Sequence, residues 1–242
     1  QARVIVQLNK PMSLNNDVRN PLKLIQMGAQ WLFAQRGPLT VSAGQVGGMI
    51  RSPIARDERA DVLLNVMPLS VDKPGDPLHQ FSGFSASAAQ CRPESRGKLE
   101  IVSDSPHQSP KIDAGYFTGP HDIKVLVEGL KALRDIFNQP SFKGLVKDEY
   151  FPGPATASDA DLETFARNKG GTVFHASGTC RMGSDSNAVV DPQLRVNGMS
   201  GLRVIDASVM PTMTSANTNA ATIMIGERGA ALVRQQSQSS SH

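Results

Sequence analysis

One histidine stands in a segment that is uncommon in a folded chain, TVFHASGTCRMG at residues 172–183. Small residues and two glycines surround His175, and the segment has neither a helical nor a strand period. A histidine that titrates near neutral pH can accept the proton of an alcohol while a hydride leaves the adjacent carbon. His175 is therefore a candidate catalytic base, and Phe174 beside it is a candidate apolar wall of the substrate pocket.

A second group of polar residues, Asn217, Thr218 and Asn219, stands at the start of a predicted helix. The first turn of a helix presents unpaired N–H groups and a partial positive charge, so it stabilises an anion or a carbonyl that gains negative charge. A reduced flavin has such a group at its N1/C2 edge. Asn217 is also a candidate to hold the substrate oxygen by a hydrogen bond. The helix is apolar almost all round, so we expect it to be buried.

The elements before this helix set its surroundings. A compact apolar strand is predicted at residues 202–205, and it ends at Asp206 and Ala207. The order strand, loop and buried helix is typical of layers that bind cofactors. We expect Asp206 to face a ribityl or phosphate group and the Ala207 N–H to donate to it. The competing hypotheses are that Asp206 only caps a turn and that Asn217 only caps the helix.

The rest of the chain predicts a mixed fold of class α/β (α+β), an antiparallel sheet with helices on one face. Strands are expected at residues 4–8, 59–70 and 98–103. Helices are expected at residues 20–37, 121–137 and 158–169, the last with a capping box formed by Ser158 and Asp161. In the first of these helices Leu24, Met27, Trp31 and Ala34 recur at helical spacing and are predicted to face the core. The second helix has one predicted apolar face, which consists of Ile123, Leu126, Val127, Leu130, Leu133 and Phe137.

Composition excludes several classes of function. The net charge of the 242-residue chain is +3 with scattered basic residues, so we expect no nucleic-acid partner. Two cysteines and dispersed histidines predict no metal site. No stretch approaches about 18 apolar residues, so we expect no transmembrane helix. The helix that contains Trp31 could face a membrane, but an amphipathic helix usually faces a core, so membrane contact is the less favoured alternative. The absence of a leader favours the cytoplasm, although a removed signal peptide would leave no trace. Residues 236–242 are predicted to be a disordered tail.

Three stretches together resemble the C-terminal part of the glucose–methanol–choline (GMC) oxidoreductases: HASGTCRMG, AVVDPQLRVNGMSGLRVIDASVMPT and NTNAATIMIGERGA. The resemblance implies FAD as cofactor and a small-molecule alcohol as substrate. The alcohol becomes an aldehyde or ketone as hydride passes to flavin N5. It also implies that His175 and Asn217 form the catalytic pair and contact the substrate, with asparagine at the second position as in the choline-type branch. The implied flavin contacts are Asp206, Ala207, Asn217, Thr218, Asn219 and Thr222.

The chain departs from this family at one point. The family begins with a GxGxxG turn that holds the FAD pyrophosphate, and the nearest stretch here, GQVGGM at residues 44–49, lacks that spacing. We therefore expect a second chain to carry the main FAD-binding half, with residues 1–182 as the substrate domain and 183–235 as the end of the FAD domain. Two alternatives stay open: a hydroxynitrile lyase on the same fold, and a non-catalytic assembly half. The alcohol and the electron acceptor are not indicated.

Overall fold

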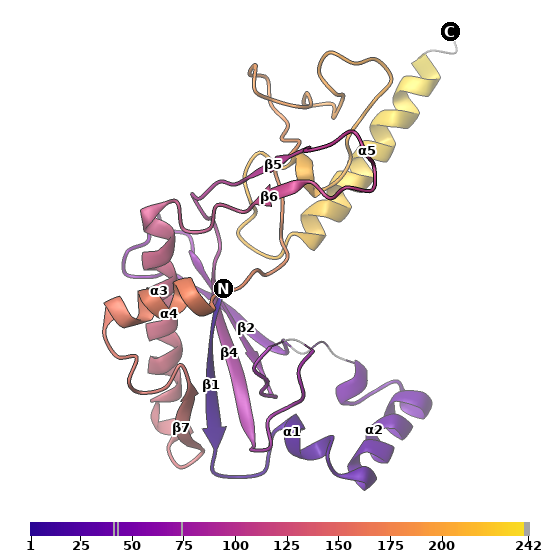
Figure 1. The fold of residues 1–242 in the computed structure, drawn as a ribbon. Coiled ribbons are helices and arrows are strands. Elements are labelled where there is room, and N and C mark those ends of the chain that lie inside the picture. Colours follow the sequence, from indigo (N-terminus) through magenta and orange to yellow (C-terminus); the bar gives the residue numbers. More distant parts are fainter. Residues whose placement is uncertain (41, 43, 74, 240–242) are drawn as a thin grey trace. The chain divides into compact units, whose positions relative to one another are not determined.

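The computed structural model describes residues 1–40, 42, 44–73 and 75–239, and it divides into two compact units (Figure 1). The sheet unit comprises Gln1–Gln90 and Pro120–Gly171. The terminal unit comprises Cys91–Gly119 and the chain from Thr172 onward. The terminal unit therefore includes residues 91–119 and the histidine segment, which the sequence assigned to the substrate domain. The two predicted functional domains remain predictions.

The sheet unit is built on a five-stranded antiparallel sheet in the order β2-β3-β4-β1-β7. The predicted sheet with helices is confirmed. The central strand pair, β1 and β4, is covered on both faces, because consecutive residues are buried: Val4, Ile5 and Val6 in β1, and the small residues 85–89 in β4. The strands are β1 Ala2–Leu8, β2 Val46–Ile50, β3 Val62–Met67, β4 Gly83–Gln90 and β7 Val146–Phe151.

Two helices cover the sheet. Helix α3 (Pro120–Phe137) packs on β4, β1 and β3, and α4 (Asp159–Lys169) packs on α3. All six apolar residues of the predicted α3 face are buried, and the capping box of α4 is present as predicted. At Gly129 the α3 backbone comes so close to the sheet that an added Cβ would lie 2.8 Å from Ala88 Cβ. A side chain at this position would push the helix away.

The first long helix is correctly placed, but its predicted core face is wrong. After α1 (Leu14–Asp17), the Asn20 side chain caps α2 (Pro21–Ala34) by accepting hydrogen bonds from two amides of its first turn. Met27 is buried, whereas Leu24, Trp31 and Ala34 are exposed. The main contact of α2 is with the short 3-10 turn η1 (Pro38–Thr40) rather than with the sheet. Most of the predicted core face therefore has no neighbouring element to bury it.

The terminal unit contains little regular structure before its last helix. Strands β5 (Lys98–Glu100) and β6 (Lys111–Asp113) form a separate two-stranded ribbon, so the strand predicted at 98–103 is shorter than expected. The strand predicted at residues 202–205 is absent. Only an isolated bridge joins Arg203 to Arg195, because a strand forms only where a neighbour pairs with it. The 3-10 turn η3 (Ala207–Val209) follows directly.

The last helix, α5 (Asn219–Ser239), is not buried all round as predicted. Ile225 is buried, whereas Ile223, Met224 and Val233 are exposed, because the terminal unit packs against only one face of the helix. The helix also runs through residues 236–239, where a disordered tail was predicted, and residues 240–242 lie outside the described part of the chain. No helix within the described residues is long and apolar enough to cross a bilayer.

Two glycine substitutions test the packing of α3. Gly129→Ala should lower the free energy of unfolding by about 1–3 kcal/mol, because its methyl group would collide with Ala88 and Val62. Gly28→Ala in α2 is the matched control. No atom lies within 4 Å of its added Cβ, so the change should stabilise the helix by about 0.5–1 kcal/mol. Urea unfolding measures both, and equal effects would contradict the close approach.

Candidate active site

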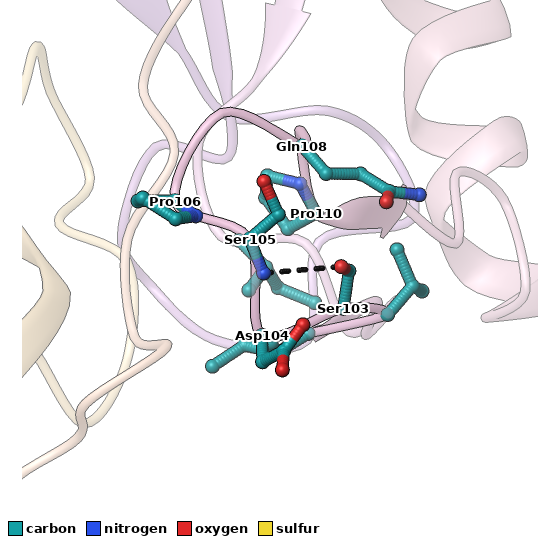
Figure 2. Close-up of a pocket in the computed structure, with 9 residues that line it drawn as sticks. Ser103, Asp104, Ser105, Pro106, Gln108 and Pro110 are labelled. Atoms are coloured by element: carbon teal, nitrogen blue, oxygen red, sulfur yellow. Dashed lines mark hydrogen bonds between the residues drawn. The ribbon is translucent and has the colours of Figure 1, made fainter.

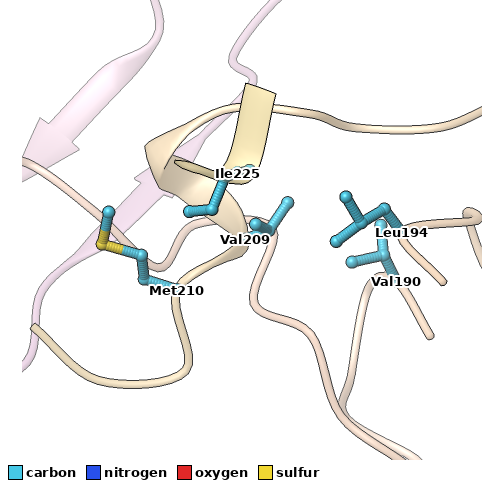
Figure 3. Close-up of a cluster of buried hydrophobic side chains, with 5 residues drawn as sticks. All are labelled: Val190, Leu194, Val209, Met210 and Ile225. Atoms are coloured by element: carbon cyan, nitrogen blue, oxygen red, sulfur yellow. The ribbon is translucent and has the colours of Figure 1, made fainter. Parts of the chain in front are cut away.

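The terminal unit is organised around one small hydrophobic cluster, formed by Val190, Leu194, Val209, Met210 and Ile225 (Figure 3). The cluster joins η3 to α5 through Val209 and Ile225 and adds the loop around Val190. Gly229 of α5 allows a further close contact, since an added Cβ there would lie 2.2 Å from Ile205 Cγ2. The start of α5 and the turn at Ala207 are therefore held by the same apolar contacts.

The histidine segment lies alongside η3. The amides of Gly178, Cys180 and Met182 donate to the carbonyls of residues 207, 208 and 209 over 3.4, 2.9 and 2.8 Å. Gly178 has a φ of +85°, a conformation that glycine adopts at little cost. These hydrogen bonds place the residues that follow His175 beside the predicted flavin contacts Asp206 and Ala207.

The side chain of His175 is available for chemistry. It is partly buried, and none of the described residues hydrogen-bonds its ring. A purely structural histidine is normally held by such bonds. Phe174 before it is largely exposed and has a φ of +61°, and its amide donates to the Thr172 hydroxyl at 2.9 Å. A phenylalanine in this left-handed conformation is strained.

The start of α5 has the geometry expected of an anion site. The Thr222 amide and hydroxyl both donate to the Thr218 carbonyl, at 2.9 and 2.8 Å, so buried Thr218 and not Asn217 occupies the cap position. Asn217 and Asn219 are exposed. The amides that follow have no intrahelical carbonyl to pair with, and no described side chain caps them.

Asp206 already has a structural partner. Its exposed carboxylate accepts a hydrogen bond of 2.7 Å from the Ser208 amide and thereby caps η3. The Ala207 amide has no hydrogen-bond partner among the described residues. This turn therefore presents one free donor, the Ala207 amide, and a carboxylate whose hydrogen-bond partner among the described residues is the Ser208 amide.

The structure brings His175, Asp206, Ala207 and Asn217 into one unit, but no hydrogen bond joins His175 to Asn217 in the described chain. It also adds a residue that the sequence did not indicate. Arg92 Nη1 donates to Ser215 Oγ at 2.9 Å, two residues before Asn217. The two residues are 123 positions apart, so no local pattern could have predicted this contact.

A bidentate ion pair holds the loop after the histidine segment. Arg181 donates to both carboxylate oxygens of Asp185, at 2.9 and 2.6 Å. This hydrogen bonding from Arg181, with a further bond from the Asn187 amide, lowers the pKa of Asp185 to about 2. The pair stays ionised at neutral pH and stabilises the turn. The described residues contain no group of three His, Cys, Asp or Glu side chains arranged to bind a metal.

The terminal unit also has an open hollow, which is formed by residues 99–110 (Figure 2). The loop there is held by a hydrogen bond of 3.1 Å from the Ser105 amide to the Ser103 hydroxyl. None of the predicted site residues lines this hollow, so it is not part of the candidate site.

Comparison with known proteins bears directly on this arrangement. The sequence model described as GMC oxidoreductase matches residues 93–226, more than half of this chain. The chain belongs to the GMC oxidoreductase family. The matched range of this GMC protein contains the histidine segment, η3 and the first turns of α5, and the predicted family membership is confirmed.

Individual relatives agree with this membership. The chain is 37% identical over 203 residues to an alcohol dehydrogenase [acceptor] of Pseudomonas putida, covering 84% of this chain and 37% of that protein. It is 39% identical over 208 residues to an oxygen-dependent choline dehydrogenase of Pseudomonas aeruginosa (strain LESB58), covering 86% and 37%. A formate oxidase of Aspergillus oryzae RIB40 shares the fold, with a TM-score of 0.90 at 21% identity over 98% of this chain and 46% of that one.

Two neighbouring valines test the apolar cluster that holds the site of this GMC protein. Val190→Ala should destabilise the terminal unit by about 2 kcal/mol, because Val190 is completely buried and the truncation leaves a cavity. Val189→Ala removes the same atoms from a side chain that is 38% exposed and should cost well under half as much. Thermal unfolding followed by near-UV circular dichroism compares them, and similar losses would refute the packing described above.

Proposed function

We propose that this chain is the C-terminal part of an FAD-dependent enzyme that oxidises an alcohol to an aldehyde or ketone. The observation that carries the proposal is the set of hydrogen bonds from residues 178–182 to residues 207–209. These hydrogen bonds bring the histidine segment next to η3, which leads to the start of α5, and the flavin contacts are expected at both places. The ring of His175 in this segment has no hydrogen-bond partner among the described residues. The names of the dehydrogenase relatives support the same reaction class.

The residues present fit the part of FAD that this chain would hold. The free amides at the start of α5 lie in the positive field of a 21-residue helix, which suits the N1/C2 edge of a reduced flavin. The unpaired Ala207 amide is a further donor, and Asn219 and Thr222 border the same turn. When bound, FAD supplies the hydride acceptor at its N5 atom.

His175 and Asn217 would then act on the substrate oxygen. His175 accepts the hydroxyl proton at a ring nitrogen, which increases the electron density that expels the hydride from the carbon. The Asn217 amide donates a hydrogen bond to the same oxygen and fixes its orientation. Phe174 supplies an apolar surface next to the base, and its exclusion of water would strengthen both polar contacts.

We further infer that the pyrophosphate of FAD is held outside this chain. The chain spans 37% of the length of the two curated relatives, and its sequence lacks the dinucleotide-binding turn. The exposed Ile223, Met224 and Val233 of α5 form an apolar face that suits packing against the remaining FAD-binding half. That half is either a second chain or the rest of a longer one.

Replacement of the proposed base tests its role. His175→Ala in the FAD-loaded enzyme should lower turnover by about 10²–10⁴-fold, with flavin content unchanged, because only the proton acceptor is lost. His107→Ala is the control, since His107 is exposed in the loop of the separate hollow. Steady-state alcohol oxidation measures both, and a His175→Ala enzyme with near-normal turnover would overturn the assignment.

The polypeptide and flavin content of the purified active material tests whether a further FAD-binding half is required. Purified active material should show the visible absorption of an oxidised flavin, and a denaturing gel of the same fraction should show polypeptide in addition to these 242 residues. The physical reason is that this chain presents donors for the flavin ring but no cradle for the pyrophosphate. Flavin bound stoichiometrically to these residues alone would contradict the inference.

A further inference from the structure

The loop that carries Asn217, residues 211–217, is fixed at both of its ends. Before it, Met210 belongs to the buried cluster (Figure 3). After it, Thr218 is buried, and its carbonyl accepts hydrogen bonds from the amide and the hydroxyl of Thr222. Asn217 itself is exposed, and its side chain makes no hydrogen bond with the described residues. The position of its side-chain amide therefore depends on how the loop backbone is held.

One side chain from a distant segment holds the middle of this loop. Arg92 Nη1 donates to Ser215 Oγ over 2.9 Å, and both residues are partly buried. A second hydrogen bond, from the Thr214 hydroxyl to the Ala216 carbonyl, stays within the loop. Among the hydrogen bonds of the described residues, the contact with Arg92 is thus the one that ties residues 211–217 to another segment of the chain.

The backbone that carries Arg92 is itself braced within the terminal unit. The Gly119 amide donates to Ser95 Oγ over 3.0 Å, which joins the two ends of the stretch that contains the β5–β6 ribbon. At Gly97 the chain passes so close to itself that an added Cβ would lie 2.2 Å from the Asp113 carbonyl oxygen. The guanidinium of Arg92 therefore extends from an anchored backbone toward the loop before α5.

We propose that Arg92 is a positioning residue for the alcohol oxidation, and this inference rests on the proposed function. Through Ser215, Arg92 fixes the backbone two residues before Asn217, so that the Asn217 amide meets the substrate oxygen in one orientation. Orientation matters because a misplacement of about 1 Å can slow a reaction about 100-fold. Arginine suits this task, since its planar fork of donors is preorganised and loses less freedom than lysine for each hydrogen bond formed.

The competing hypothesis is that the contact only stabilises the terminal unit. The buried cluster already joins η3 to α5 through Val209 and Ile225, and no side chain of residues 211–217 packs against it. Loss of one partly exposed hydroxyl in the loop should therefore leave the fold intact. The geometry of the loop is what the contact between Arg92 and Ser215 controls, and this makes the two hypotheses separable.

Removal of the acceptor isolates the contact, because Ser215→Ala leaves Arg92 in place. In the FAD-loaded protein this variant should lower kcat for the alcohol about 10–100-fold, with little change in KM, flavin content or Tm. Ser215→Thr keeps a hydroxyl and should restore most of the turnover. The matched control is Thr212→Ala, which removes an exposed hydroxyl of the same loop that makes no hydrogen bond with the described residues, and it should leave kcat unchanged.

Two further measurements show whether Arg92 acts through Ser215. The double variant Arg92→Ala/Ser215→Ala should be no slower than Arg92→Ala, because both substitutions break the same contact. NMR of methionine methyl groups reports on the loop without any turnover. In Ser215→Ala the order parameter of the Met213 methyl should fall, whereas that of Met27 in the sheet unit should stay unchanged.

Three results would overturn the inference. They are normal turnover in Ser215→Ala, a double variant whose loss equals the product of the two single losses, and a Met213 methyl that does not respond to Ser215→Ala. An unmodified protein that oxidises no alcohol would instead overturn the proposed function, and the Met213 methyl would then decide alone whether Arg92 holds the loop.

Discussion

The contact between Val209 and Ile225 connects the two features on which the proposed chemistry of this chain depends. Val209 ends the turn that carries Asp206 and Ala207, and Ile225 lies less than two turns into α5. The backbone carbonyl of the same valine accepts the hydrogen bond from Met182, at the end of the histidine segment. One small cluster thus joins a turn, a helix start and the end of the histidine segment.

The two units differ in how complete their cores are. In the sheet unit α3 closes over β1, β3 and β4, and nearly every apolar residue of that helix face is buried. The terminal unit leaves three large apolar residues of α5 exposed, so its core is complete only when another structure covers them. An incomplete core in the terminal unit is consistent with the proposal that a further FAD-binding half packs against α5.

The sequence predicted those elements whose stabilising contacts are local or lie within this chain. Asn20, Ser158 and Asp161 identified two helix starts through short-range hydrogen bonds, and the period of α3 identified its buried face. The helical spacing of apolar residues in α2 led to a wrong prediction of its core face. Such spacing indicates which side of a helix is apolar, but it does not indicate which part of the protein covers that side. The strand predicted at residues 202–205 does not form, because its pairing within the described chain is limited to the bridge between Arg203 and Arg195. Arg92 was missed because its partner is distant in sequence.

The central claim is that His175 serves an oxidation in which the flavin is the hydride acceptor. The most direct test is anaerobic mixing of the FAD-loaded protein with aliphatic, aromatic and sugar alcohols, followed by visible absorption and by assay of the carbonyl product. The account predicts that one class of alcohol bleaches the oxidised flavin and yields one equivalent of aldehyde or ketone per flavin. A flavin spectrum that stays unchanged with every alcohol, in material that still binds FAD, would contradict it.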